Sequence, residues 1–105
     1  GTYRPSSILE REMSSNDFEQ HLACAAPNFV KGTVPESIAA IVEWVRKFLN
    51  ENNLLPPKTE VLRLVDEVFD EHVGPMIKGK LMRAIANELL LAAVGEIYDA
   101  IAADA

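Results

Sequence analysis

The C-terminal third of the sequence carries apolar residues on almost every side of the helix that its spacing predicts. From Pro75 onward, apolar residues recur at helical intervals nearly to the end of the chain: Met76, Ile77, Leu81, Met82, Ile85, Leu89, Leu90, Val94, Ile97 and Ile101. Residues 89–94 are apolar without interruption, so a helix formed by this stretch has no polar face. A helix that is apolar all round lies at the centre of a bundle or is covered by another chain. The segment therefore predicts a helical bundle, and it favours association with a second protein chain.

Two amphipathic helices are predicted before this segment. The first begins near Pro35, because proline is tolerated in a first helical turn, and it is expected to end near Asn52 and Asn53. Its apolar face is formed by Ile38, Ile41, Val42, Val45 and Leu49. The second begins after Pro56 and Pro57 and carries Val61, Val65, Val68, Phe69, His72 and Val73 at helical spacing. Gly74 is well placed to follow this helix, where it is free to take a left-handed conformation, and Pro75 prevents simple continuation.

The N-terminal third has a weaker pattern. Asn16 and Asp17 can cap a short helix whose apolar face includes Phe18 and Leu22, with Pro27 closing it. Residues 1–15 are expected to form an arm, mobile or partly helical. The sequence thus predicts an all-α protein with a single domain over residues 16–105. That domain is a small bundle of about four helices, one short N-terminal helix and three longer ones.

Composition narrows the classes of partner. Ten Lys and Arg against sixteen Asp and Glu give a net charge of −6, which repels nucleic-acid phosphates and anionic membrane surfaces. The longest apolar run is far shorter than the ~20 residues that a membrane-spanning helix needs. The single cysteine, Cys24, cannot form an internal disulfide, so nothing requires an oxidising compartment. A cytoplasmic protein with a protein partner is expected, with no nucleic acid, membrane or cofactor.

Residues 66–72 hold four carboxylates and a histidine, which raises the question of a metal or acid/base site. A solvated acidic helix face is the simpler interpretation, because the residue three before His72 is Phe69 and not the glutamate of a carboxylate-bridged metal site. Asp17, His21 and Cys24 would share one face of the short helix and offer three ligand types to zinc. They are weak metal candidates, because structural zinc sites usually use paired Cys or His spacings from two segments.

Two functional hypotheses remain open. The first is a small acidic interaction or regulatory module that forms a homodimer or docks on a partner protein through its apolar C-terminal helix. Its interface candidates are Leu89, Leu90, Ala93, Val94, Ile97 and Ile101. The second is a ligand-binding or metal-binding bundle, or an enzyme, with a pocket lined by Trp44, Phe48, His72 and Met76. No catalytic residue is assigned, and an enzyme is the less favoured of the two hypotheses.

Overall fold

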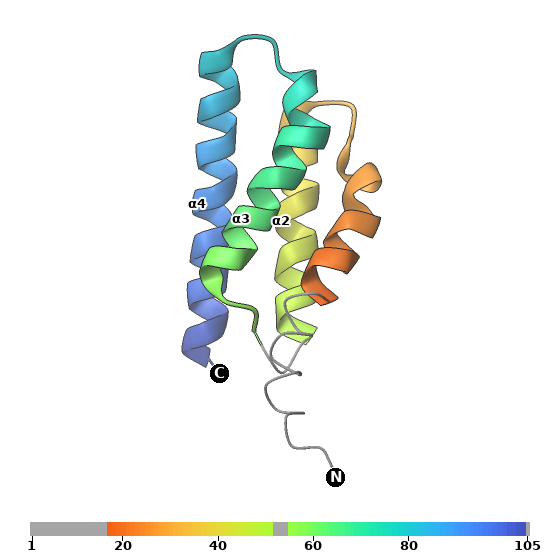
Figure 1. Ribbon diagram of the computed structural model, residues 1–105. Helices are drawn as coiled ribbons and strands as arrows, with labels where there is room; N and C mark the ends of the chain where they lie inside the picture. Colours follow the sequence, from red (N-terminus) through yellow and green to blue (C-terminus); the bar gives the residue numbers. More distant parts are fainter. Residues whose placement is uncertain (1–16, 52–54, 105) are drawn as a thin grey trace.

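The computed structural model describes residues 17–51 and 55–104, and in this part of the chain it has four helices and no strand. A helix that includes residues 17–25 continues into the 3-10 turn η1 (Ala26–Phe29). Three longer helical segments follow: α2 (Val34–Glu51), α3 (Lys58–Val68) and α4 (Lys80–Asp104). They run up and down beside one another (Figure 1). The predicted all-α bundle is confirmed, whereas the arm predicted for residues 1–15 lies outside the described residues.

The start of α2 is fixed by a capping arrangement around Thr33 and Ser37. The Thr33 hydroxyl accepts a hydrogen bond from the Glu36 backbone N–H at 3.3 Å and donates to the Glu36 carboxylate at 3.1 Å. The fully buried Ser37 hydroxyl donates to the Thr33 carbonyl at 3.0 Å and accepts from the Lys31 N–H at 2.9 Å. These bonds satisfy backbone groups that the first helical turn leaves unpaired. They fix the start of α2 at Val34, just before Pro35.

α3 does not end at a left-handed Gly74 as expected from the sequence. The chain widens into the π-helical turn η2 (Phe69–Val73), in which the Gly74 N–H donates to the Phe69 carbonyl. A wider turn advances fewer degrees per residue, so Val73 is rotated back onto the face that Phe69 buries, and both are in the core. Gly74 itself is right-handed, with φ −51° and ψ −44°, and begins the 3-10 turn η3 (Gly74–Met76).

The prediction of a left-handed Gly74 is therefore wrong, because the chain keeps its right-handed course through η3 before it reverses. The positive φ falls at Gly79, with a value of 97°, immediately before α4. The prediction that the last helix continues from Pro75 is wrong for the same reason. Residues 77–79 are extended or bent, and α4 begins only at Lys80. This link separates the end of η3 from the start of α4 and lets the two elements diverge (Figure 1).

One hydrophobic core joins all four helices. Helix 17–25 contributes Phe18 and Leu22, and the other elements contribute Phe29, Ile41, Val45, Leu49, Val61, Leu64, Val65, Val68, Phe69, Val73, Ala86, Leu90 and Val94. Leu90 and Val94 are completely buried between α4 and the other helices. Every residue from Lys80 to Ile85 is exposed, so the first turns of α4 extend past the core. The packing therefore covers the C-terminal part of α4 better than its start.

Polar contacts hold α4 against α3 along the same covered part. Asn87 donates to the Asp66 carboxylate at 2.6 Å, and Lys58 forms an ion pair with Asp99 at 3.0 Å. The Tyr98 hydroxyl donates to the backbone carbonyl of Pro56, just before α3. Burial of the Tyr98 phenol, followed by the nearby Asp99 charge, raises its pKa above the ordinary value. These contacts fix which face of α4 turns toward α3.

Two neighbouring leucines of α4 provide a test of its orientation. Leu90 is 0% exposed, whereas Leu89 is 63% exposed. Leu90→Ala should lower the free energy of unfolding by about 2–5 kcal/mol, because it leaves a core cavity. Leu89→Ala, measured in dilute protein, should change it by no more than about 0.5 kcal/mol. Urea unfolding followed by circular dichroism measures both, and equal losses would contradict this orientation of α4.

The raised pKa of Tyr98 predicts a pH effect at the alkaline end. Because the folded pKa is above the unfolded value of about 10, the stabilisation is complete below that pH and is lost as pH rises through the folded pKa. The absorbance titration of tyrosinate should show a component above the ordinary range that disappears in Tyr98→Phe. The same variant should lose about 1 kcal/mol at neutral pH, because it lacks the hydrogen bond to Pro56. An unchanged titration in the variant would contradict the assignment.

Candidate functional site

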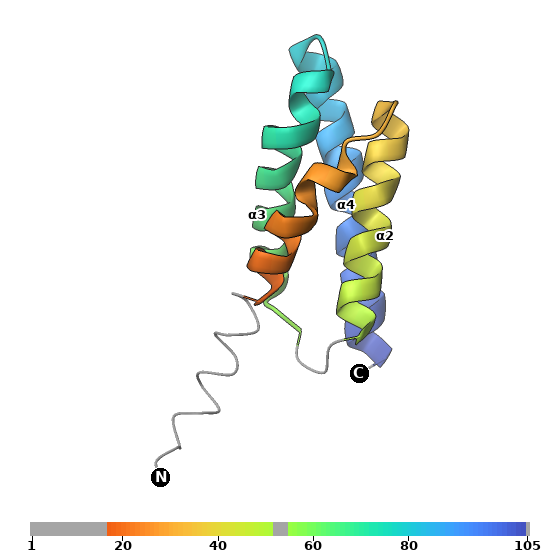
Figure 2. The ribbon, with the colours of Figure 1, turned by 90° about the vertical axis from the view of Figure 1, so that its right-hand side faces the viewer.

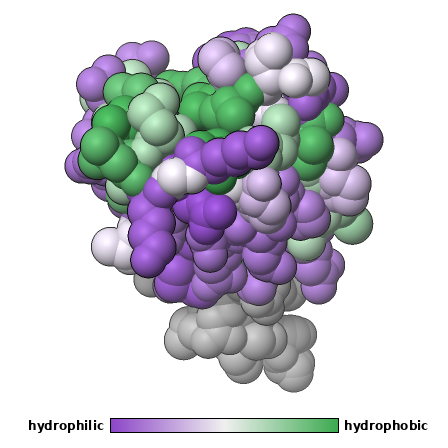
Figure 3. All heavy atoms as spheres, turned by 90° about the horizontal axis from the view of Figure 1, so that it is seen from above, coloured by the Kyte–Doolittle hydropathy of each residue, from purple (hydrophilic) through white to green (hydrophobic). Residues whose placement is uncertain are grey.

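Four large apolar side chains of α4 face solvent. Leu81 is 73% exposed, Met82 60%, Ile85 42% and Leu89 63%. At 100° per residue they fall within an arc of about 100° centred on Ile85, on the side of α4 opposite Leu90 and Val94. We call this group the α4 outer patch. In the view from the α3–α4 turn, apolar side chains gather over the start of α4, at the left of Figure 3.

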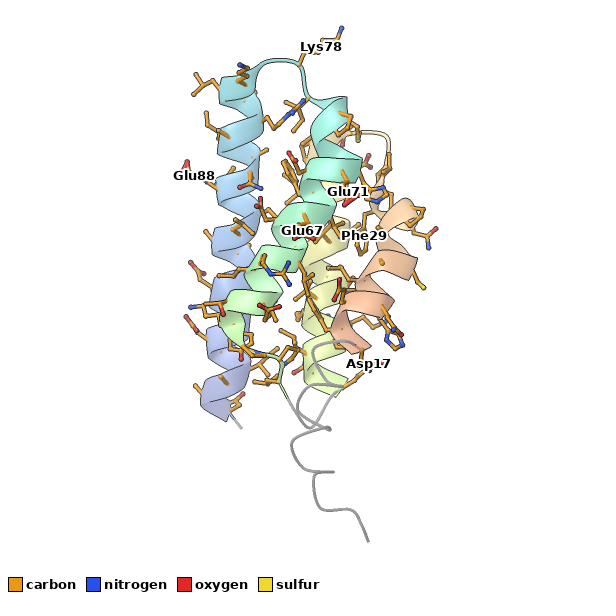
Figure 4. All side chains as sticks on the ribbon, in the orientation of Figure 1. Asp17, Phe29, Glu67, Glu71, Lys78 and Glu88 are labelled. Carbon is orange, nitrogen blue, oxygen red and sulfur yellow. The ribbon has the colours of Figure 1, made fainter. Side chains whose placement is uncertain are left out.

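The arrangement of the helices explains why this patch is uncovered. α3 lies against α4 near the Lys58 end and leans away from it toward the turn (Figure 1). The helix that includes residues 17–25 lies on the far side of α2 and α3 from α4 (Figure 2). The surface beside the patch carries Glu88, which points away from the bundle on the outer side of α4 (Figure 4). Within residues 17–51 and 55–104, no element packs over the outer side of α4 at this level.

The interface candidates predicted from the sequence divide between two sides of α4. Leu90 and Val94 are completely buried in the core of the single chain. Ala93, Ile97 and Ile101 are half-buried, and only Leu89 is largely exposed. The predicted set omitted Leu81, Met82 and Ile85, although all three belong to the same periodic segment. The uninterrupted apolar run at 89–94 lies in the covered part of the helix, whereas the exposed apolar surface lies closer to its start.

Three of the predicted pocket residues, Trp44, Phe48 and Met76, lie at two different levels along α2. Trp44 stacks on Phe48 with ring centroids 5.1 Å apart, and Phe18 lies 5.8 Å from Trp44 and 5.4 Å from Phe48. These aromatic rings join the N-terminal helix to α2. Met76 instead lies near Ser37, with its sulfur 3.9 Å from the hydroxyl oxygen. Ser37 is about 10 Å along α2 from Trp44.

His72, the remaining pocket candidate, is half-buried in η2. The contacts of Trp44 and Phe48 with Phe18 show that both rings serve in packing between the N-terminal helix and α2.

The weak metal candidates share one helix face but do not make a ligand set. The His21 ring nitrogen Nδ1 lies 2.8 Å from the Asp17 carbonyl oxygen and 3.1 Å from its carboxylate, and the ring lies 5.6 Å from that of Phe48. Cys24 is exposed and free. Across the part of the chain that the structure describes, no three His, Cys, Asp or Glu side chains are grouped to hold a metal ion.

The acidic face of α3 is engaged in ordinary surface pairing. Arg63 contacts Glu60 at 2.7 Å and Glu67 at 2.8 Å, and its hydrogen bond to Glu60 lowers the pKa of that carboxyl group. Asp70 and Glu71 are exposed, and Glu67 and Glu71 lie along the outer surface of α3 (Figure 4). Exposed ion pairs of this kind contribute little to stability, because water and salt screen them. The acidic residues in 66–72 therefore lie on a solvated helix face.

Comparisons of the chain with protein-family models, with curated proteins and with solved structures found no match. Among the described helices, none combines the length and the apolar character needed to cross a membrane. The exposed apolar surface of α4 is therefore the feature from which a function is inferred.

The aromatic contacts predict how the N-terminal helix is attached. Phe18→Ala should lower the free energy of unfolding by about 3–5 kcal/mol, because the ring is completely buried between Trp44 and Phe48. It should also shift Trp44 fluorescence to longer wavelength, since the indole gains contact with water. Gln20→Ala, at an exposed position of the same helix, is the matched control. An unchanged emission spectrum in the folded Phe18→Ala protein would contradict the packing.

Proposed function

We propose that this protein is a small helical interaction module that self-associates, or docks on a partner protein, through the α4 outer patch. The observation that carries the proposal is the exposure of Leu81, Met82, Ile85 and Leu89 on one side of a single helix. Apolar residues scattered singly on a surface need no explanation, whereas adjacent ones that form a patch often mark an interaction site. The patch lies on a regular helix, which presents its side chains in a fixed arrangement.

The size of the patch favours a weak, reversible interaction. Burying a large aliphatic side chain contributes about 1.5–3 kcal/mol, and these four are already partly covered. Association costs at least about 4 kcal/mol in lost translational and rotational freedom. A stable interface also usually takes about 800 Å² from each partner, which four side chains supply only in part. We therefore expect association that depends on protein concentration, not an obligate complex.

The helical patch suits another helix as its partner. Residues that recur three and four positions apart form a stripe that packs into the facing groove of an amphipathic helix. Nucleic acid remains a poor alternative, because the chain carries a net charge of −6. The polar and charged residues beside the stripe, including Glu88, keep the surface soluble when it is unoccupied.

Sedimentation velocity over about 1 µM to 1 mM protein tests the proposal. The wild-type chain should show a mass that rises with concentration, and the double variant Leu81→Gln, Leu89→Gln should remain a monomer. Ala102→Gln provides the control, because it introduces the same side chain at an exposed position of α4 outside the patch. All three proteins should unfold at similar urea concentrations. A wild-type chain that is monomeric throughout, or a double variant that associates equally well, would contradict self-association through this surface.

A further inference from the structure

We propose that the partner of the α4 outer patch is the same patch on a second copy of the chain, packed antiparallel about a two-fold axis near residue 87. This inference rests on the proposed function and adds the partner and its direction. Three features of α4 support it: the spacing of its outer residues, the match of their sizes on reversal, and the charges at the two ends of the stripe.

The outer residues of α4 have the spacing of a coiled-coil seam. Met82, Ile85, Leu89, Ala92 and Glu96 follow one another at intervals of three, four, three and four residues. This alternation keeps one stripe of a helix facing a partner helix along its length. Met82, Ile85, Leu89, Ala92 and Glu96 are all exposed, and the stripe lies opposite the core residues Leu90 and Val94. A second helix can therefore approach without displacing α2 or α3.

Reversal of the stripe matches its residues by size. With the axis near residue 87, Ile85 of one copy lies level with Leu89 of the other, and Met82 lies level with Ala92. The two central layers then contain two branched aliphatic side chains each. The flanking layers pair a long methionine with a small alanine, which is how packed helices fill space without a void. A parallel pair would instead place Met82 against Met82 and Ala92 against Ala92.

The charges at the two ends of the stripe also favour reversal. Glu96 is exposed on the outer side of α4, and Lys78 extends from the turn that precedes the helix (Figure 4). In the antiparallel arrangement the two Glu96 carboxylates lie about 27 Å apart along the helix axes, and each approaches the turn of the other copy, which carries Lys78. A parallel arrangement would bring the two Glu96 carboxylates together. Unlike charges across an interface fix its register and suppress the wrong one.

Glu88 is expected to weaken the antiparallel pair, and mutation of this residue can test the expectation. Glu88 lies on the flank of the stripe, one position from the proposed axis, so the Glu88 carboxylates of the two copies lie on the same side of the pair and close together. Like charges placed side by side weaken an interface. Glu88→Gln should therefore strengthen self-association about two- to five-fold, whereas Glu96→Gln should weaken it by a similar factor. The same change of charge on the same helix is expected to act in opposite directions.

Cross-linking of single-cysteine variants tests the direction directly. In a Cys24→Ser background, Glu88→Cys and Ala103→Cys are each treated with a bismaleimide that spans about 10 Å, close to the separation of packed helix axes. Residue 103 also faces outward, but in the antiparallel pair its two copies are roughly 50 Å apart along the helix axes. We expect covalent dimers from Glu88→Cys and none from Ala103→Cys. The Leu81→Gln, Leu89→Gln double change should abolish the Glu88→Cys product.

The outcomes separate this inference from the proposed function. Covalent dimers from both variants would establish a parallel pair, which overturns the antiparallel register and leaves association through the patch standing. Association in the centrifuge without cross-linking at either position, together with no opposite effect of the two glutamate changes, would also overturn the register. A chain that stays monomeric up to about 1 mM would overturn the second copy as partner, whereas it would not contradict docking of a different protein on the patch, the other form of the proposed function.

Discussion

Burial of Leu90 and Val94 is the interaction on which the rest of this structure depends. Both side chains are completely enclosed, and they set the rotation of α4 about its own axis. Since α4 is apolar on nearly all sides, another rotation would also have buried apolar surface. The contacts with Asp66 and Pro56 add polar restraints that only one rotation satisfies, through Asn87 and Tyr98. Once this rotation is fixed, Leu81, Met82, Ile85 and Leu89 have no place in the core.

The turn between α3 and α4 determines how far the patch is uncovered. The π-helical turn η2 follows α3 and keeps Phe69 and Val73 in the core. The chain therefore leaves the bundle only after Gly74. η3 and residues 77–79 then carry the chain across to α4 (Figure 1). The first turns of α4 lie beyond the last core layer, which is why Ala86 is the first of its residues to be buried. An isolated chain with this geometry exposes apolar surface that folding alone does not remove.

Much of the bundle follows from local patterns. The periodic apolar residues of α2 and α3 predict their helices and their core faces, and Phe18 and Leu22 predict the short N-terminal helix. A glycine before proline is a common left-handed helix stop, yet Gly74 is right-handed. The backbone N–H of Gly74 donates to the Phe69 carbonyl, and the Arg83 side chain lies close to Gly74. Of the pocket candidates, Trp44 belongs to α2 and stacks there on Phe48, whereas Met76 contacts α2 about two turns away at Ser37, which helical period alone does not reveal.

The sequence by itself determined which segments are helical and that the last one is apolar around its circumference, because helical period and side-chain polarity are local properties. The tertiary structure decided which side of that helix is buried. A helix whose apolar residues are spread around its circumference has no strongly preferred face of its own, so the packing of α2 and α3 against Leu90 and Val94 decided that Ile85 and Leu89 face solvent. The position of the candidate surface near the start of α4 is therefore a result of packing between distant parts of the chain.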